Sequence, residues 1–328
     1  MHILIIGAAG MVGRKLTAAL AKAGQVGGTE VTRLTLADVI KPEPVAFSAT
    51  VEAVAADLSV PATSATLVAS RPDLIFHLAA IVSGEAEADV DKGYRINLDG
   101  TRYLLEAIRQ QGMRSPYLPK LVFTSSIAVF GAPFPDAIGD EFFSTPLTSY
   151  GTQKAICELL LNDYSRRGFV DGIGIRLPTV VIRPGKPNLA ASGFFSNILR
   201  EPLAGQEAVL PVSKDVRHWF ASPRAAVGFL IHASGLDTHK LGWRRTLSAP
   251  GLSATVGEEI EALRRVAGDR AVSLIREEPN ETIIRIVDGW ARNFDTRRAL
   301  ALGFRAESSF DDIIRIHIED ELGGKVGG

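Results

Sequence analysis

Short apolar segments rich in β-branched residues recur through the first half of the chain, and helical patterns separate them. Several of these segments are almost continuously apolar, which is typical of strands that are covered on both faces. This alternation predicts βαβ units around a parallel sheet. The expected strands are His2–Gly7, Val31–Asp38, Val51–Ala56, Leu74–Leu78, Lys120–Thr124 and Gly172–Leu177.

The segments between these strands carry apolar residues at helical spacing. Right-handed crossovers through such helices give a doubly wound Rossmann sheet, so the expected fold class is α/β. The expected helices are Met11–Ala23, Thr63–Ser70, Val90–Gln111 and Ser149–Arg167.

After about residue 180 the alternation stops and helical patterns dominate. We expect a Rossmann domain over residues 1–180 and a smaller, mostly helical C-terminal lobe over 181–328, and some strands and helices of the lobe can return to the first domain. The lobe's expected helices are Gly193–Glu201, Pro223–Ala233, Val256–Val266, Thr296–Leu302 and Phe310–Leu322, with short strands near Thr246–Ser248 and Thr282–Val287.

Composition and net charge limit the kinds of molecule that we expect the chain to bind. The chain has 328 residues, with 36 Lys and Arg against 37 Asp and Glu. This balance provides no general attraction to nucleic acid or to an anionic membrane. The single cysteine, Cys157, excludes an intrachain disulfide and a Cys-rich metal site. No apolar run approaches the length of a membrane span, and the first residues lack a basic leader, so we expect a cytoplasmic protein.

A glycine-rich turn follows the first expected strand and opens the first expected helix. Its glycines are Gly7, Gly10 and Gly13, and Met11 and Val12 lie between the last two. Glycines permit a tight turn and let backbone N–H groups approach a pyrophosphate at the helix N-terminus. The spacing predicts a dinucleotide site, although a plain strand-to-helix turn is the alternative.

Acidic residues at the next strand ends bear on which dinucleotide binds. Asp38 ends the second strand, where a carboxylate accepts from both ribose hydroxyls and repels a 2′-phosphate, which favours NAD over NADP. The alternative is a strand-end residue that caps a turn.

Asp57 and Leu58 follow the third strand, where Asp57 either meets the adenine amino group or caps the next helix. Leu78, Ala79 and Ala80 end the fourth strand and leave room for a flat cofactor.

Tyr150 and Lys154 stand four residues apart on an expected helix and therefore share a face. A free tyrosine has a pKa near 10, and a nearby ammonium favours the phenolate. Ser125 and Ser126 follow the fifth strand, at the sheet edge where α/β sites form. Ser126 is placed to orient a substrate hydroxyl toward Tyr150, whereas Ser125 either contacts the cofactor or forms the turn.

For the other potentially reactive side chains we expect structural roles in the packed interior. His77 is expected to be a packed, hydrogen-bonded histidine, and Cys157 to pack on its helix. Trp219, Trp243 and Trp290 are expected in the core or at a contact between lobes. The remaining histidines lack metal-ligand spacing, so no metal is expected.

Together these motifs resemble the extended short-chain dehydrogenase/reductase superfamily in its epimerase/dehydratase branch, over residues 1 to about 320. The segment Tyr94–Thr101 is similar to the family's helix with an asparagine near the cofactor, which implies that Asn97 supports the active-site backbone. The resemblance implies NAD as cofactor, bound by the first domain. It also implies that Pro178 and Val180 flank the nicotinamide. The helices at Val90–Gln111 and Ser149–Arg167 resemble those that pair in the family's homodimers.

The chain departs from the nucleotide-sugar enzymes of this family at three places. Ile127 and Ala128 replace the dehydratases' Asp-Glu pair, so dehydration is not expected, because elimination of water needs a general acid and base. Thr179 stands where many epimerases have an asparagine that touches the substrate's diphosphate. His218 replaces the aspartate of a family Arg-Asp segment. These changes put a nucleotide-diphosphate pocket in doubt.

The pattern is most similar to D-erythronate dehydrogenase-like proteins, which implies NAD-dependent oxidation of a small sugar acid at C2. Tyr150 would take the hydroxyl proton, Ser126 would position that hydroxyl, and Lys154 would lower the pKa of Tyr150 and grip the ribose. Two alternatives stay open. One is a nucleoside-diphosphate-sugar 4-epimerase with tightly bound NAD, and the other is a non-catalytic NAD-sensing protein.

An acid substrate also needs a partner for its carboxylate, because a buried unpaired carboxylate is costly. A guanidinium binds carboxylate in a two-pronged way. Arg217 is the first candidate and Arg183 the second, and Ser83 and Thr179 are candidates for hydroxyl contacts. An ordinary salt bridge is the alternative role of Arg217.

Overall fold

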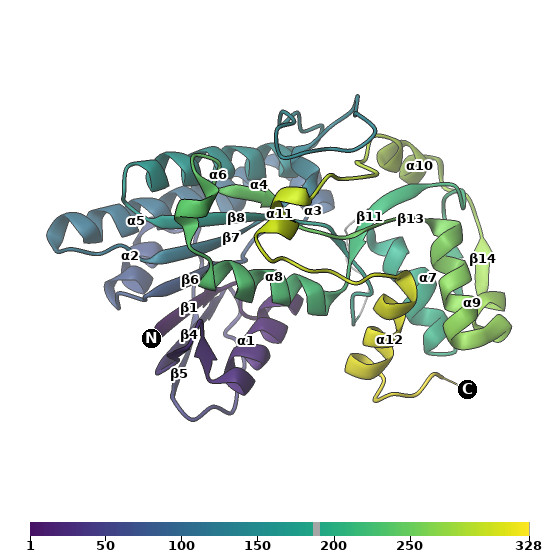
Figure 1. The fold of residues 1–328 in the computed structure, drawn as a ribbon, viewed down its shortest axis with the longest axis horizontal. Helices are drawn as coiled ribbons and strands as arrows, with labels where there is room; N and C mark the ends of the chain where they lie inside the picture. The colour runs from purple at the N-terminus through teal and green to yellow at the C-terminus, as the bar shows by residue number, and fades with distance from the viewer. Residues whose placement is uncertain (186–190, 328) are drawn as a thin grey trace. The chain divides into compact units, whose positions relative to one another are not determined.

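The computed structural model describes residues 1–185 and 191–327 of the chain (Figure 1). Its contacts divide the chain into two compact units, and the backbone passes between them several times. Unit 1 comprises Met1–Val129, Thr148–Arg176 and Val227–Leu247, and unit 2 comprises Phe130–Leu147, Leu177–Ala226 and Ser248–Gly328. The assignment of cofactor binding to residues 1–180 and of substrate binding to the remainder stays a prediction.

A seven-stranded sheet forms the centre of unit 1, in the order β12-β8-β7-β6-β1-β4-β5. Strand β1 pairs in parallel with both β4 and β6, so the strand order reverses beside β1, as in a doubly wound sheet. The predicted α/β Rossmann fold and its strands are confirmed. The strands are β1 (His2–Ile6), β4 (Arg33–Asp38), β5 (Thr50–Ala55), β6 (Leu74–His77), β7 (Lys120–Ser126), β8 (Asp171–Leu177) and β12 (Thr246–Ser248).

Successive residues of each strand face opposite sides, so the apolar strands give the sheet two apolar faces. Helices cover both of these faces. Leu4 and Ile6 of β1 share a buried cluster with residues of α2 (Pro61–Ala69), α5 (Gly100–Arg114) and α6 (Ser149–Arg166). Helix α1 (Met11–Ala23) packs on β1 through Leu16 and Leu20. Figure 1 shows α1 on the other side of the sheet from α5 and α6.

The predicted helix Val90–Gln111 is interrupted. It consists of α4 (Val90–Gly93), a π-helical turn η1 (Tyr94–Asp99) and the start of α5. Such turns occur often at functional sites. The short helix α3 (Ser83–Ala88) precedes it, α8 (Pro223–Gly235) leads back into unit 1, and β2 (Gln25–Val26) and β3 (Thr29–Glu30) form a small hairpin.

Unit 2 has its own apolar core and contains two small sheets. Phe195, Phe220, Leu263 and Ile314 are all fully buried in it. One sheet has the order β13-β11-β9, and β10 pairs with β14. The elements are β9 (Thr179–Val180), α7 (Gly193–Leu203), β10 (Ala208–Leu210), β11 (Arg217–Ala221), β13 (Leu252–Thr255), α9 (Val256–Ser273), β14 (Ile275–Glu277), α10 (Glu281–Asp288), α11 (Arg297–Ala301) and α12 (Phe310–Glu321).

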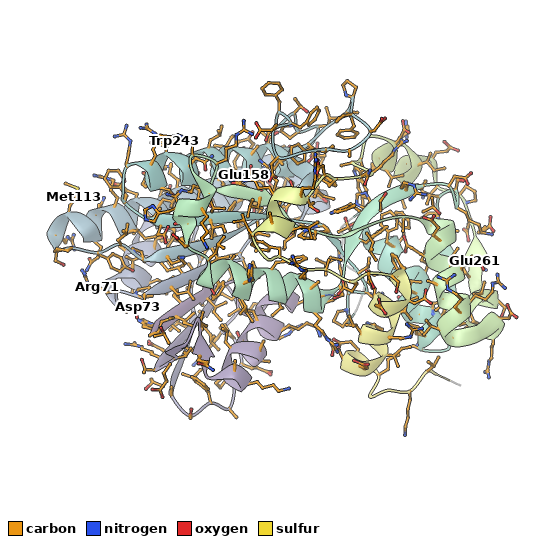
Figure 2. All side chains as sticks on the ribbon, in the orientation of Figure 1. Arg71, Asp73, Met113, Glu158, Trp243 and Glu261 are labelled. Atoms are coloured by element: carbon orange, nitrogen blue, oxygen red, sulfur yellow. The ribbon has the colours of Figure 1, made fainter. Side chains whose placement is uncertain are left out.

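Two predictions for the second half are wrong. Residues 282–287 form helix α10 rather than a strand, because the Asn280 side chain accepts from the N–H groups of Thr282 and Ile283 and so caps a helix. Trp243 is 84% exposed instead of buried (Figure 2). Trp219, by contrast, is buried as predicted.

Among the residues described, no helix is both long and apolar enough to cross a membrane.

Helix α9 buries an acidic side chain in the core of unit 2. Glu259 is fully buried, and within residues 1–185 and 191–327 neither of its carboxyl oxygens has a hydrogen-bond partner. Burial raises the pKa of this carboxyl well above its usual value. The core therefore holds the neutral acid, at a cost that grows with pH.

We expect Glu259→Leu to increase the free energy of unfolding by about 1–3 kcal/mol near pH 7, because it removes an unsatisfied buried group. The unfolded chain loses this proton near its ordinary pKa while the folded chain keeps it. Wild-type stability therefore falls as pH rises above that value, and the advantage of the variant grows. Urea unfolding at several pH values measures this. Glu261→Leu, at an exposed position of the same helix, is the matched control. A variant no more stable than wild type at pH 7 would contradict this account of Glu259.

Candidate active site

The glycine-rich turn packs the end of β1 against the end of β6. Gly7 has a φ of +91°, and a Cβ atom there would lie 2.6 Å from the backbone nitrogen of Ala79. A Cβ at Gly13 would lie 2.1 Å from the carbonyl oxygen of Gly7. No side chain caps the N-terminus of α1, which begins at Met11 after Gly10. Its first-turn N–H groups suit the phosphates of a dinucleotide, so this turn fits NAD.

Asp38 lies at the carboxyl end of β4, beside this turn. One carboxylate oxygen accepts from the N–H of Ala9 at 2.9 Å, and the other accepts from Val39 at 2.7 Å. The carboxylate therefore fixes the position of the turn and leaves acceptor capacity for a ribose.

Asp57 and Leu58 follow β5. Asp57 is exposed and accepts from the N–H of Ser59 at 2.9 Å. Helix α2 begins at Pro61 with Val60 as its N-cap, so the alternative that Asp57 caps this helix is wrong. Leu58 is buried next to Gly100.

The backbone after β6 is bound by the side-chain amide of Asn97, which in turn is bound by the side-chain amide of Gln153. Asn97, in the π-helical turn, accepts from the N–H of Ile81 at 2.9 Å and donates to the Ile81 carbonyl at 3.2 Å. It also donates to the amide oxygen of Gln153 at 2.8 Å. Gln153 is fully buried and lies between Tyr150 and Lys154 on α6. This relay connects α6 to the backbone beyond Leu78, Ala79 and Ala80.

His77, at the end of β6, is packed as expected. Its ring nitrogen Nε2 lies 2.9 Å from the hydroxyl of Thr101. Burial, followed by the charge of Lys154, lowers the pKa of His77 to about 3, so it is neutral near pH 7.

Tyr150 and Lys154 lie one turn apart at the start of α6. The Thr148 hydroxyl caps this helix by accepting from the N–H of Gly151 at 3.1 Å. The Lys154 ammonium is buried and donates to the Thr124 carbonyl oxygen on β7 at 2.8 Å. It lies 5.8 Å from the centre of the Tyr150 ring. Burial lowers the pKa of Lys154 to about 8, although nearby Cys157 and Glu158 oppose this shift.

Ser125 and Ser126 end β7 and play different structural roles. Ser126 is partly exposed, and its hydroxyl accepts from the N–H of Ala128 at 3.1 Å. Ser125 is buried and donates to Glu158 at 2.5 Å. Glu158 also receives two charge-assisted bonds from Arg176, at 2.7 and 2.9 Å. The Ser125 side chain therefore faces a buried ion pair.

Sequence reasoning missed Gln153, Glu158 and Arg176. A signal existed, because Glu158 stands four residues after Lys154 and continues the helix face that begins at Tyr150. A charged residue on a face that is buried in the structure requires a partner, and Arg176 on β8 supplies it.

Several candidate residues belong to unit 2. Thr179 lies on β9 with its hydroxyl 2.6 Å from His218. Arg183 donates to the Val180 carbonyl oxygen at 3.0 Å and to the Ser192 hydroxyl at 2.8 Å. Pro178 and Val180 flank Thr179 and are both buried. Ser83, in unit 1, is the first residue of α3.

Arg217, the first candidate for the carboxylate, is engaged elsewhere. It donates to the Ser253 carbonyl oxygen at 3.0 Å and pairs with Glu258 at 3.3 Å. Glu258 belongs to the capping box of α9, so this ion pair joins β11 to the start of that helix.

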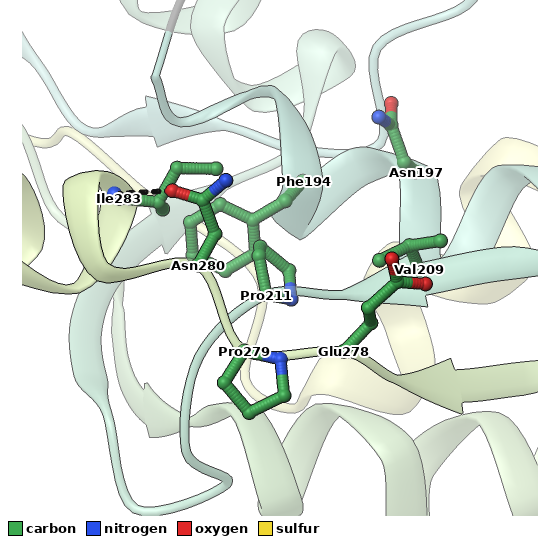
Figure 3. A pocket seen from close by; sticks show the side chains of 8 residues that line it. All are labelled: Phe194, Asn197, Val209, Pro211, Glu278, Pro279, Asn280 and Ile283. Atoms are coloured by element: carbon green, nitrogen blue, oxygen red, sulfur yellow. Dashed lines mark hydrogen bonds between the residues drawn. The ribbon is translucent and has the colours of Figure 1, made fainter.

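Unit 2 also has a surface hollow of about 290 Å³ beside α7 and β10 (Figure 3). None of its eight lining residues is a predicted site residue. They are Phe194, Asn197, Val209, Pro211, Glu278, Pro279, Asn280 and Ile283. Over the described ranges, no cluster of three or more His, Cys, Asp or Glu side chains could hold a metal ion.

Comparison with protein families matches residues 3–223 to the NAD dependent epimerase/dehydratase family. Among curated proteins, the chain is 46% identical over 324 residues to the D-erythronate dehydrogenase of Cupriavidus necator, covering 98% of each chain. It is 42% identical over 322 residues to the D-erythronate dehydrogenase of Haemophilus influenzae, covering 98% of this chain and all of that protein.

Solved structures agree on the fold. A nucleoside-diphosphate-sugar epimerase from Agrobacterium tumefaciens is 70% identical with a TM-score of 0.97, covering 99% of this chain and 95% of that one. An L-threonine 3-dehydrogenase from Trypanosoma brucei is 24% identical with a TM-score of 0.85, covering 99% of both chains, and shows likeness of fold alone.

Burial of Lys154 leads to a stability prediction. In the folded chain the ammonium loses its proton near pH 8, whereas in the unfolded chain it keeps it to about pH 10.4. Between these values the unfolded chain binds more protons, so wild-type stability rises with pH. We expect wild type to gain about 1.4 kcal/mol per pH unit relative to Lys154→Met over this range. Urea unfolding at pH 7, 8, 9 and 10 measures the difference.

Lys22→Met is the matched control, because Lys22 is exposed in the last turn of α1. The difference in the free energy of unfolding between Lys22→Met and wild type should stay constant over the same pH range. A pH-independent difference for Lys154→Met would show that the ammonium is not destabilised by burial.

Proposed function

The chain belongs to the NAD dependent epimerase/dehydratase family, and on this premise we propose that it oxidises a secondary hydroxyl of a small sugar acid, D-erythronate at C2, to the 2-oxo acid. The observation that carries the proposal is the placement of Tyr150 beside a buried Lys154 ammonium. The names of the two curated relatives support the choice of substrate, because each comparison covers 98% of this chain.

In the proposed reaction Tyr150, as the phenolate, accepts the proton of the C2 hydroxyl, and Ser126 orients that hydroxyl. NAD, when bound, would supply the hydride acceptor that lets the C2–H bond break as the C=O bond forms. Lys154 stabilises the phenolate and holds the ribose hydroxyls. The relay from Gln153 through Asn97 keeps the neighbouring backbone in place.

For the cofactor we propose three groups of contacts. The glycine turn with Met11 and Val12 holds the pyrophosphate at the start of α1. Asp38 binds the adenosine ribose. The remaining contacts come from Asp57, Leu58, Leu78, Ala79, Ala80, Asn97, Ser125, Tyr150, Lys154, Pro178 and Val180.

For the substrate carboxylate we now favour Arg183 over Arg217. Successive residues of a strand face opposite sides, so Arg217 and His218 on β11 lie on opposite faces. Thr179 lies on the His218 side. Burial is the main cause that lowers the pKa of His218, and the charge of Arg183 acts in the same direction. Arg217 already pairs with Glu258 on the other side. Ser83 and Thr179 are the proposed hydroxyl contacts.

A nucleoside-diphosphate-sugar 4-epimerase is the second candidate, favoured by the name of the 70% identical structure. An epimerase would regenerate its NAD and release no net NADH. We also propose a homodimer formed through the segments 90–111 and 149–167, and a cytoplasmic location.

We expect NADH to accumulate when the protein is mixed with NAD and D-erythronate, and absorbance measures it. Tyr150→Phe should lower kcat by about 10²- to 10⁴-fold, because it removes the proton acceptor, while NAD affinity is retained. Tyr164→Phe, on the same helix with its hydroxyl on Glu106, should keep near-normal turnover. Absence of NADH formation with any aldonate or uronate, or normal turnover in Tyr150→Phe, would refute the proposal.

Replacement of Asp38 should weaken the preference for NAD over NADP. We expect Asp38→Ala to lower the NAD/NADP ratio of kcat/KM by about 10-fold or more, because the carboxylate no longer repels the 2′-phosphate. Asp57→Ala is the control, since an adenine contact is common to both cofactors. An unchanged ratio in Asp38→Ala would remove Asp38 as the discriminating residue.

A further inference from the structure

A fully buried amide lies between the two residues of α6 that are proposed to carry the chemistry. Gln153 follows Tyr150 by three positions and directly precedes Lys154. Residues three positions apart on a helix project from the same side, so Gln153 belongs to the turn that carries Tyr150. Its amide oxygen Oε1 accepts from Nδ2 of Asn97 at 2.8 Å. A residue outside the helix therefore holds this turn.

Asn97 joins the turn to the backbone beyond β6. Its Oδ1 accepts from the N–H of Ile81 at 2.9 Å, and its Nδ2 donates to the Ile81 carbonyl oxygen at 3.2 Å. The backbone of Asn97 is also held, because its carbonyl oxygen accepts from the Thr101 hydroxyl at 2.7 Å and from the Cys157 thiol at 3.3 Å. The position of the Asn97 amide is therefore fixed by contacts other than the one to Gln153.

The Gln153 amide packs directly against the backbone of α4. A Cβ atom at Gly93 would lie 2.6 Å from Nε2 of Gln153 and 3.2 Å from the Cβ of Ala86. Glycine at this position lets the backbone approach the amide closely. At the first residue of α6, the N–H of Ser149 donates to Glu87 of α3 at 2.9 Å. The start of α6 is therefore confined by α3 and α4 as well as by Asn97.

For packing alone, glutamine is an unfavourable choice here. Nε2 of Gln153 is buried and has no hydrogen-bond partner within residues 1–185 and 191–327. An unsatisfied buried donor opposes folding, whereas methionine has a similar length and would fill the space without that donor. A buried polar group that is kept despite this penalty requires an explanation other than stability.

We propose that Gln153 is a positioning residue for the oxidation: its bond to Asn97 fixes the rotation of the first turn of α6 relative to the backbone after β6. Tyr150 and Lys154 then keep one orientation relative to residues 78–80, which are proposed to contact the cofactor. All of these groups belong to unit 1. Gln153 acts on the reaction only through the two residues whose placement it controls. This inference rests on the proposed function.

Gln153→Met tests the role, because it keeps the length of the side chain and removes the acceptor. We expect kcat with NAD and D-erythronate to fall by about 10- to 100-fold, since a small misplacement of reacting groups is costly. KM for the acid should stay within about 3-fold, because the substrate contacts remain. The urea midpoint should change little, because the variant removes one unpaired donor at Nε2 and creates another at Asn97. A kcat within about 2-fold of wild type would overturn the proposal.

Two further variants show whether Gln153 acts through Asn97. Thr152→Val is the matched control, because the Thr152 hydroxyl donates only to the Thr148 carbonyl oxygen of its own helix, at 3.0 Å. It should keep kcat within about 2-fold of wild type. In an Asn97→Ala background, Gln153→Met should lower kcat by no more than about 2-fold, because the partner is already gone. Losses that multiply in the double variant would contradict the proposal.

Gly93→Ala tests the same role while Gln153 itself is unchanged. The added Cβ would meet Nε2, so the amide has to move, and we expect kcat to fall by about 10-fold. In a Gln153→Ala background the amide is absent, so Gly93→Ala should have no further effect on kcat. Losses of equal size in the two backgrounds would show that Gly93 acts independently of Gln153 and would count against the proposal.

The ionisation of Tyr150 provides a readout that needs no substrate. The phenolate absorbance of a protein minus that of the same protein carrying Tyr150→Phe isolates this residue. In Gln153→Met we expect the midpoint of the titration to lie about one pH unit above that of wild type, because the ring is no longer held beside the Lys154 ammonium. A merely structural role would not move this midpoint. An unchanged midpoint would therefore overturn the positioning role.

The two readouts separate this inference from the proposed function. If wild type releases no NADH with any aldonate or uronate, the proposed function fails, and the titration still tests whether Gln153 positions Tyr150. If wild type oxidises D-erythronate but Gln153→Met keeps the normal kcat and the wild-type midpoint, only the inference fails.

Discussion

A buried ammonium is the constraint on which unit 1 depends. Lys154 carries its charge into the space between α6 and β7, where Thr124 offers a carbonyl oxygen and Phe123 a ring face 4.7 Å away. These partners only partly offset the loss of water, which is why its pKa falls. In the proposed reaction the same charge has to stand next to Tyr150, so stability is lowered at the proposed catalytic residues.

The neighbouring charges compensate this ammonium only in part. Glu158 is one turn further along α6, yet Arg176 and Ser125 occupy its carboxylate oxygens. The ion pair anchors α6 to β8, and Glu158 offsets only part of the burial that lowers the pKa of Lys154.

Local patterns predicted the elements whose own residues determine them. The strands of the large sheet and α1 follow from continuous apolar runs and from glycines at Gly7 and Gly13, whose missing side chains the packing requires. Tyr150 and Lys154 followed from helical spacing. The apolar run in α10 suits a strand or a helix until the local Asn280 cap is recognised. Arg217 depended on a long-range partner and could not be assigned before its ion pair with Glu258 was known. Trp243 was misplaced because hydrophobicity alone does not determine burial.

The discontinuity of unit 1 has a consequence for biosynthesis. Strand β12, at the edge of the large sheet, and the segment before it come from residues 227–248, which are translated long after Tyr150 and Lys154. That late segment accepts a bond from Lys120 at Leu236, and its Arg245 N–H donates to Asn162 on α6. A nascent chain that ends at residue 226 therefore holds every proposed catalytic group, while the sheet still lacks its strand β12. Completion of the large sheet is thus delayed until residues 246–248 have been translated.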